Sequence, residues 1–130
     1  MPIEYTIDAD RQRVVCEATG NVTAEDCMAL DREMRADPGN RPEFDTLYDF
    51  SAVTGTTLSA EDIRKIARQE SYHTTDSHRA VVARSPLSYG YSRMFELCKM
   101  GRAGTWRIFN ERGEAERWLE EDRPARTETP

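Results

Sequence analysis

The stretch that decides the fold is Thr46 to Arg68, TLYDFSAVTGTTLSAEDIRKIAR. It begins with an apolar run at 47–50, which predicts a short buried strand. The hydroxyl-rich segment 54–57 is expected to end that strand as a loop, because glycine and hydroxyl-bearing residues favour turns. Ser59 then stands at the start of a predicted helix that carries Ile63 on its apolar face. A strand that feeds a helix through a loop is typical of α/β sheets, which place ligands at the carboxyl ends of their strands.

The composition bounds the class of protein. The chain has 130 residues, a net charge of −6 and 38% hydrophobic residues. That length predicts one domain whose core needs no disulfide or metal support. The negative charge disfavours binding to phosphate backbones, so nucleic acid is not an expected partner. The segment MPIEYTID carries an acid at position 4 and no apolar run of signal-peptide length, so we expect a soluble cytoplasmic protein.

Two strands and a helix are predicted before the deciding stretch. Apolar and polar residues alternate over 3–7, and a second strand follows at 13–19. We expect these two strands to form an antiparallel hairpin at one edge of the sheet, and Gly20-Asn21 to end the second one. Thr23 then caps a helix that runs to about Ala36.

The second half of the chain predicts two more pairs of strand and helix. The apolar run 80–83 predicts a strand buried on both faces. Ser85 opens a third helix that ends near Met100. Trp106 lies in the last predicted strand, and Asn110 caps a fourth helix.

These elements predict a single α/β domain over residues 1–121 with the element order ββαβαβαβα. The sheet is expected to be mixed, mostly parallel and five-stranded, with four helices. Right-handed crossovers make the last four strands parallel and leave the first antiparallel at an edge. Residues 122–130 are polar and contain proline, and we expect a disordered tail there.

Two segments carry a resemblance to a known family: Leu47 to Val53, LYDFSAV, and Tyr89 to Met94, YGYSRM. With the predicted element order, the chain resembles the SpoIIAA-like branch of the STAS family (sulfate transporter and anti-sigma factor antagonist). That branch has structural kinship with CRAL-TRIO lipid-transfer domains. The resemblance covers residues 2 to 120 and implies the corresponding fold.

The same resemblance implies where a regulatory switch would lie. Anti-sigma-factor antagonists carry an Asp-Ser-Ser-Gly motif at the next helix start, whose first serine is phosphorylated by a partner kinase. Aligned on the strand, this chain has Thr57, Leu58, Ser59 and Ala60 in that place. Leu58 therefore holds the phosphoserine position, and the resemblance implies the fold without the switch.

The segment 51–59 is the candidate ligand site. It supplies hydroxyls and backbone N–H groups at a helix start, which suit an anionic or polar group of a ligand. The alternative is a hydrogen-bonded turn with a helix cap. The candidate ligand-binding residues are Ser51, Thr54, Gly55, Thr56, Thr57 and Ser59.

Two predicted helix surfaces are candidates for contact with a protein partner, a second copy of the chain or a membrane. The second helix carries a basic stripe on an acidic protein, which a solvated helix face would also explain. The third helix leaves an aromatic residue, an arginine and a methionine outside its apolar arc, where they associate with another surface or fold over neighbouring loops. The stripe is Arg64, Lys65 and Arg68, and the patch is Tyr89, Arg93 and Met100.

The residues that could carry catalysis or bind a metal have no defining spacing. Cys16, Cys27 and Cys98 make neither a disulfide framework nor a paired metal motif, so we expect small buried hydrophobes, with a reactive thiol as the rival interpretation. His73 and His78 flank an aspartate without further ligands, so no metal site is predicted. No cofactor is expected.

The expected function is therefore non-enzymatic. We expect binding of a small hydrophobic or amphipathic ligand, or a regulatory role, through the loop and helix edge at 51–68. The alternative is a protein–protein interaction module of the anti-sigma-factor-antagonist type that has lost the phosphoserine switch. An enzyme that uses a cysteine is a third hypothesis.

Overall fold

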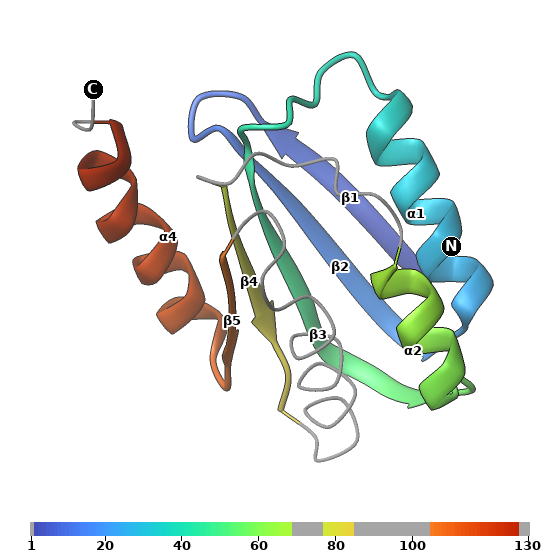
Figure 1. Ribbon diagram of the computed structural model, residues 1–130. Helices are drawn as coiled ribbons and strands as arrows, with labels where there is room; N and C mark the ends of the chain where they lie inside the picture. The colour runs from blue at the N-terminus through green and yellow to red at the C-terminus, as the bar shows by residue number, and fades with distance from the viewer. Residues whose placement is uncertain (1, 69–76, 85–104, 128–130) are drawn as a thin grey trace.

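The structure, a computed structural model, describes residues 2–68, 77–84 and 105–127. In these residues one sheet of five strands, in the order β1-β2-β3-β4-β5, is covered by helices (Figure 1). The elements are β1 (Ile3–Asp8), β2 (Arg13–Val22), α1 (Ala24–Ala36), β3 (Asp45–Thr56), α2 (Ala60–Ala67), β4 (His78–Val82), β5 (Thr105–Phe109) and α4 (Arg112–Thr127).

The directions of the strands agree with the prediction. β1 pairs antiparallel with β2 at one edge of the sheet. The other three neighbouring pairs, from β2 to β5, are parallel. The sheet is therefore mixed and mostly parallel, as the element order indicated.

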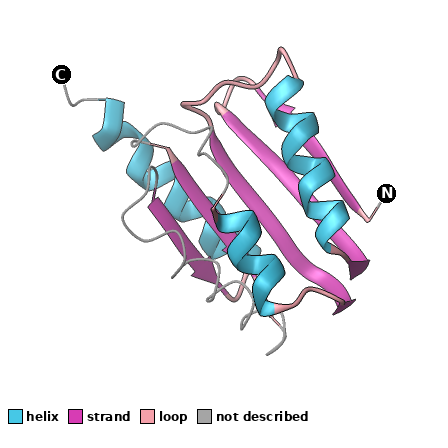
Figure 2. Cartoon of the chain, turned by 45° about the vertical axis from the view of Figure 1, so that its right-hand side comes forward, coloured by secondary structure: helices cyan, strands magenta, loops and turns pink. Residues whose placement is uncertain are grey.

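The helices lie in two layers. α1 and α2 cover one face of the sheet and contact each other, while α4 lies on the opposite face against β3, β4 and β5 (Figures 1 and 2). Each face has its own apolar core, because side chains alternate between the two faces along a strand. The core under α1 contains Val14, Cys16, Leu30 and Met34, and the core under α4 contains Leu47, Ala80, Val82, Ala115 and Leu119.

α1 and α2 begin with the same local device. The side chain of Thr23 accepts a hydrogen bond from the backbone N–H of Asp26, whose carboxylate accepts one from the backbone of Thr23. Ser59 and Asp62 make the same pair of bonds at the start of α2. These capping boxes satisfy N–H groups that a helix end leaves without intrahelical partners, which explains why both predicted starts are confirmed.

The central strand is longer than predicted. β3 continues to Thr56, so the predicted loop at 54–57 is wrong for all but its last residue. β2 also continues beyond its predicted end, and the pairs Asn21–Gly55 and Val22–Thr56 extend the parallel ladder. The reason is long-range pairing between two strands that are separated by a helix, which outweighs the local turn preference of glycine and threonine.

The last helix differs from the prediction at both ends. The backbone N–H of Ala115 donates to the carbonyl of Glu111 at 3.3 Å, so Glu111 rather than Asn110 occupies the capping position. The helix then continues to Thr127, past the predicted domain boundary at residue 121. Three helices lie in the described ranges, and the predicted helix that opens at Ser85 lies outside them. None of the helices described here has both the length and the apolar character needed to cross a bilayer.

Candidate binding site

The hydroxyl of Ser51 is held by its own strand. Ser51 lies exposed on β3, and both its backbone N–H and its hydroxyl donate to Oδ1 of Asp49, with an N–O distance of 2.9 Å for the backbone bond. These bonds, together with those from Arg112, outweigh the effect of burial and hold the pKa of the Asp49 carboxyl below its ordinary value. Ser51 therefore helps to position a carboxylate.

Two other candidate hydroxyls also make internal hydrogen bonds. Thr56 donates to the carbonyl of Val22 at 2.7 Å and accepts from the backbone N–H of Leu58 at 3.0 Å. Ser59 accepts from the N–H of Asp62 at 3.1 Å as the cap of α2. In these two residues the structure favours the alternative of a hydrogen-bonded turn with a helix cap.

The remaining candidate ligand residues lie along the same strand end. Thr54 and Thr57 are exposed. Gly55 is half-buried, and a Cβ at this position would approach Oδ1 of Asn21 to 3.3 Å, so the glycine allows the two strands to lie close. The structure places Thr54, Gly55, Thr56, Thr57 and Ser59 at the end of β3 and the start of α2, whereas Ser51 lies further back in β3 and bonds to Asp49. The ligand-binding role of these residues stays a prediction.

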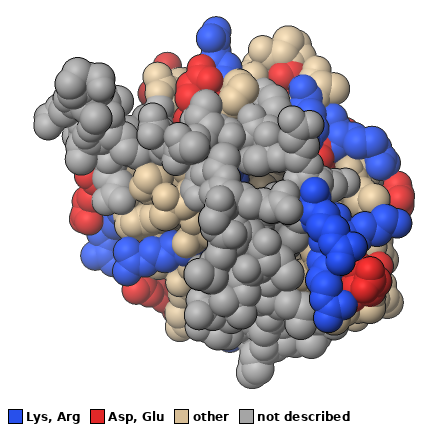
Figure 3. Space-filling model, in the orientation of Figure 1, with Lys and Arg blue, Asp and Glu red and all other residues tan. Residues whose placement is uncertain are grey.

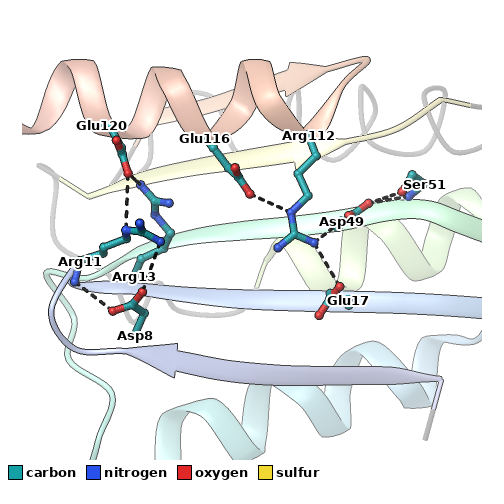
Figure 4. A network of polar contacts seen from close by, with 9 residues as sticks. All are labelled: Asp8, Arg11, Arg13, Glu17, Asp49, Ser51, Arg112, Glu116 and Glu120. Carbon is teal, nitrogen blue, oxygen red and sulfur yellow. Dashed lines mark hydrogen bonds and ion pairs between the residues drawn. The ribbon is translucent and has the colours of Figure 1, made fainter.

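Arg112 joins three carboxylates on the α4 face of the sheet, a cluster that the sequence reasoning missed. Its Nη1 lies 3.1 Å from Glu17 on β2 and 3.2 Å from Asp49 on β3, and its Nε lies 2.9 Å from Glu116 (Figure 4). The hydrogen bond to Glu116 is the largest cause of a raised pKa of Arg112. The cluster ties the start of α4 to two strands that precede it by many residues in the chain.

The exposed face of α2 carries the predicted basic stripe. Arg64, Lys65 and Arg68 are all exposed, and Figure 3 shows Lys and Arg side chains gathered over this helix. Arg64 forms an ion pair with Glu61 at 3.2 Å. Within the described part of the chain, neither Lys65 nor Arg68 makes an ion pair, so two positive charges on this face remain uncompensated by a neighbouring carboxylate.

The second predicted association surface falls elsewhere. The patch of Tyr89, Arg93 and Met100 lies outside the described residues, as do Cys98 and His73. Its proposed contact with a second copy of the chain or with a membrane stays a prediction.

Of the two described cysteines, Cys16 is buried and Cys27 is half-buried. Cys16 lies in the core with its Sγ 3.7 Å from Sδ of Met34, and burial raises its pKa to about 12. Burial, with a smaller contribution from Asp26, raises the pKa of Cys27 to about 11. Both thiols are therefore protonated at neutral pH, whereas a nucleophilic cysteine needs a lowered pKa.

Metal chemistry has no support in the residues that the structure describes. No group of three or more His, Cys, Asp or Glu side chains within these ranges is arranged to hold an ion. His78 is buried on β4, and its ring lies 4.7 Å from that of Trp118. This packing is typical of a core histidine.

Comparison with protein-family models and with curated proteins gives no match. Among solved structures, the chain is similar to an uncharacterized protein of the DUF3478 family from Shewanella loihica PV-4, described as having a SpoIIAA-like fold. The two share 20% sequence identity with a TM-score of 0.58, over 90% of this chain and 93% of that chain. This chain has a SpoIIAA-like fold.

In this SpoIIAA-like fold, the residues 57–60, which the sequence resemblance aligns with the phosphorylated motif, lie between the end of β3 and the first residue of α2. Leu58, which the sequence comparison places at the phosphoserine position, is half-buried, and its N–H is bonded to Thr56. Ser59, the serine that remains, is the helix cap. The resemblance stated from the sequence is therefore confirmed for the fold.

Proposed function

We propose that the chain is a non-enzymatic regulatory domain that binds an acidic surface of a protein partner through α2. The single observation that carries this proposal is the exposed pair Lys65 and Arg68, which lacks ion-pair partners in the described residues of a chain with net charge −6. A positive surface on an otherwise acidic protein attracts a negatively charged partner to that surface, while the rest of the protein repels the same partner.

The neighbouring residues favour a docking role for α2. Glu61 is paired with Arg64, and Asp62 is bonded to the helix cap, so neither acid of the first turn neutralises the end of the helix. Ile63 is buried on the opposite side of the helix and anchors it. The helix therefore presents charge outward from a fixed position, which reduces the entropy lost on binding.

The non-enzymatic part of the proposal rests on the residues that could act as nucleophiles. Burial raises the pKa of both described thiols, and the hydroxyls of Ser51 and Ser59 are engaged with aspartates as donor and acceptor respectively. An activated serine or cysteine needs an effective general base or a lowered pKa, and Asp49, whose pKa lies below its ordinary value, is only a weak base for Ser51. These groups support the sheet and α2.

The test is a pull-down in which the wild type and two charge-reversal variants each serve as bait. We expect the wild type to recover a stoichiometric partner that is released by salt, and the double variant K65E/R68E to lose it. The matched control is R41E/R117E, which changes net charge equally at two exposed arginines away from α2. Recovery by all three proteins alike, or by none, would contradict the proposal.

A second arm distinguishes a membrane from a protein. The wild type and both double variants are mixed with vesicles of phosphatidylcholine that contain phosphatidylserine, and flotation is measured. We expect no flotation. If the wild type floats and only K65E/R68E stays behind, the α2 surface binds anionic lipid and the protein-partner proposal fails.

A further inference from the structure

Arg79 on β4 is a buried cation with an unsatisfied donor. Only 2% of the residue is exposed, and Nη2 is buried without a hydrogen-bond partner. Nη1 donates to the hydroxyl of Ser77 at 3.3 Å. No carboxylate within the described ranges lies at ion-pair distance. Burial lowers the pKa of the guanidinium, and Tyr48 and Asp45 offset part of that change. A buried charge without an ion-pair partner, and a buried N–H group without an acceptor, are both costly.

The other buried arginine of the described chain shows the contrast. Arg13 also has one buried nitrogen without a partner, Nε, but its Nη2 lies 3.9 Å from the carboxylate of Glu120. Arg13 is therefore neutralised by its own fold. Arg79 has no such ion pair in the described residues. Asp45 favours its charged form without lying at ion-pair distance, and a serine and an aromatic ring contact the guanidinium.

The neighbours of Arg79 form one row across the sheet. Thr46 on β3 and Trp106 on β5 are its register partners, so the three side chains share the face that α1 and α2 cover. Oγ1 of Thr46 is also buried without a partner. Two unsatisfied polar groups thus lie on adjacent strands at the same level.

Aromatic rings flank the guanidinium. Its Cζ lies 5.4 Å from the ring centroid of Trp106, and the rings of Trp106 and Tyr48 are 4° from parallel with centroids 5.9 Å apart. Both rings are half-buried. Contact with an aromatic face stabilises a cation but does not satisfy its N–H groups.

We propose that Arg79 anchors a binding site for a small monocarboxylate with an apolar or aromatic body. The carboxylate accepts hydrogen bonds from Nη2 of Arg79 and from the hydroxyl of Thr46, and the body packs against Tyr48 and Trp106. This site is separate from α2 and does not depend on the function proposed for that helix.

The single positive charge of Arg79 favours a carboxylate ligand over a phosphate monoester. One guanidinium neutralises one negative charge, and a planar carboxylate matches its fork of donors. A phosphate monoester carries close to two negative charges at neutral pH, which would leave excess charge buried in a row that offers no second cation among the described residues.

The test uses the indole of Trp106 as a reporter. The chain has two tryptophans, so Trp118→Phe leaves Trp106 as the single tryptophan, which is excited selectively at the long-wavelength edge of its absorption. We expect octanoate and benzoate to give a saturable change in emission. Their neutral counterparts, octanamide and benzamide, and also phenyl phosphate, are expected to bind at least about tenfold more weakly.

Further substitutions in the Trp118→Phe protein test whether the carboxylate binds to Arg79. Arg79→Met is expected to abolish the response to octanoate, and Thr46→Val to weaken it while retaining its volume. The matched control is Arg107→Met, which removes an arginine 5.8 Å from the ring of Trp118 on the opposite face and is expected to bind as before. Circular dichroism checks that each variant folds, and if Arg79→Met does not, Thr46→Val decides.

Three results would overturn the proposal. The first is the absence of a saturable response to either carboxylate, which would assign the unsatisfied donor to bound water. The second is equal binding of the amides, and the third is unchanged binding in folded Arg79→Met or, if that variant does not fold, in Thr46→Val. Loss of partner binding in K65E/R68E tests a different surface, so the two proposals fail independently.

Discussion

Arg112 and Asp49 are 63 positions apart in the sequence, yet Nη1 of the arginine lies 3.2 Å from Oδ2 of the aspartate. The pair fastens the first turn of α4 to the middle of β3. Asp49 is only 12% exposed in its side chain, so water does little to replace the arginine. The stability of this face of the sheet therefore depends on a contact between a central strand and a helix that follows it much later in the sequence.

Arg112→Gln is expected to lower the free energy of unfolding by about 1–2 kcal/mol, because it weakens bonds to a largely buried carboxylate. Urea unfolding at pH 7 measures it. The control Arg11→Gln removes ion pairs between exposed side chains and should cost less than about 0.5 kcal/mol. Equal effects in the two variants would show that the Asp49 contact has no special weight.

The free energy of unfolding should depend on pH in a way that reports the ionisation of Asp49. Its pKa in the folded protein lies below the ordinary value of 3.8, so the ionised carboxylate stabilises the fold above that value. This contribution is lost as the pH falls through the folded-state pKa. We therefore expect the difference in unfolding free energy between the wild type and Asp49→Asn to shrink from pH 6 toward pH 2.5. A constant difference would contradict the assignment.

The helix caps make a second stability prediction. Ser59→Ala should cost about 1 kcal/mol, because it leaves the N–H of Asp62 without its acceptor. Thr57→Ala is the control, since Thr57 is exposed two residues earlier and makes no side-chain hydrogen bond in the described residues. Denaturant melts compare the two, and a cost for Thr57→Ala as large as that for Ser59→Ala would argue against capping.

Leu58→Ala tests whether the position that the sequence resemblance aligns with the phosphoserine is part of the core. The residue is half-buried, so Leu58→Ala should cost about 1 kcal/mol, less than the 2–5 kcal/mol typical of a fully buried leucine. Leu47→Ala, at a residue with 0% exposure, provides the fully buried comparison. If both cost the same in urea melts, the loop before α2 packs more tightly than its exposure indicates.

The thiols should be inert in the folded protein. In a Cys98→Ser background, we expect no alkylation of Cys16 or Cys27 by iodoacetamide at pH 8, because their pKa values are raised to about 12 and 11. Intact mass measures the label, and denaturant should expose both sites. Rapid labelling of native protein would revive the hypothesis of a reactive cysteine.

The local signals explain what could be predicted from the sequence. Thr23 and Ser59 each stand three residues before an acid, and the bonds that start both helices are formed within one turn. The apolar run at 80–83 is buried as predicted, with β3 and β5 on either side and α4 against one face of β4. The predicted order of strands and helices then indicated that the last four strands are parallel, because crossover connections in such sheets are right-handed.

The proposed binding residues, and the cluster around Arg112, depend on residues that lie far apart in the chain. Arg79 precedes an apolar strand and looks like an ordinary boundary residue until β3 and β5 place Thr46 and Trp106 beside it. Arg112 likewise acquires its partners Glu17 and Asp49 only when four strands are assembled. The sequence offered one signal for Arg79, which is its position next to a fully apolar strand. A charged residue is rarely buried in such a place without a partner.

The length of β3 has a consequence for how the protein avoids aggregation. Beyond Asp49, the last residue paired with β4, the strand pairs only with β2 within the described residues. Such an overhang is a template on which a foreign strand can add. Here the ladder with β2 is irregular between Glu17 and Thr19 and again after Gly20, whose φ is 69°. These bulges twist the overhang away from the flat geometry that stacking of chains into fibrils requires.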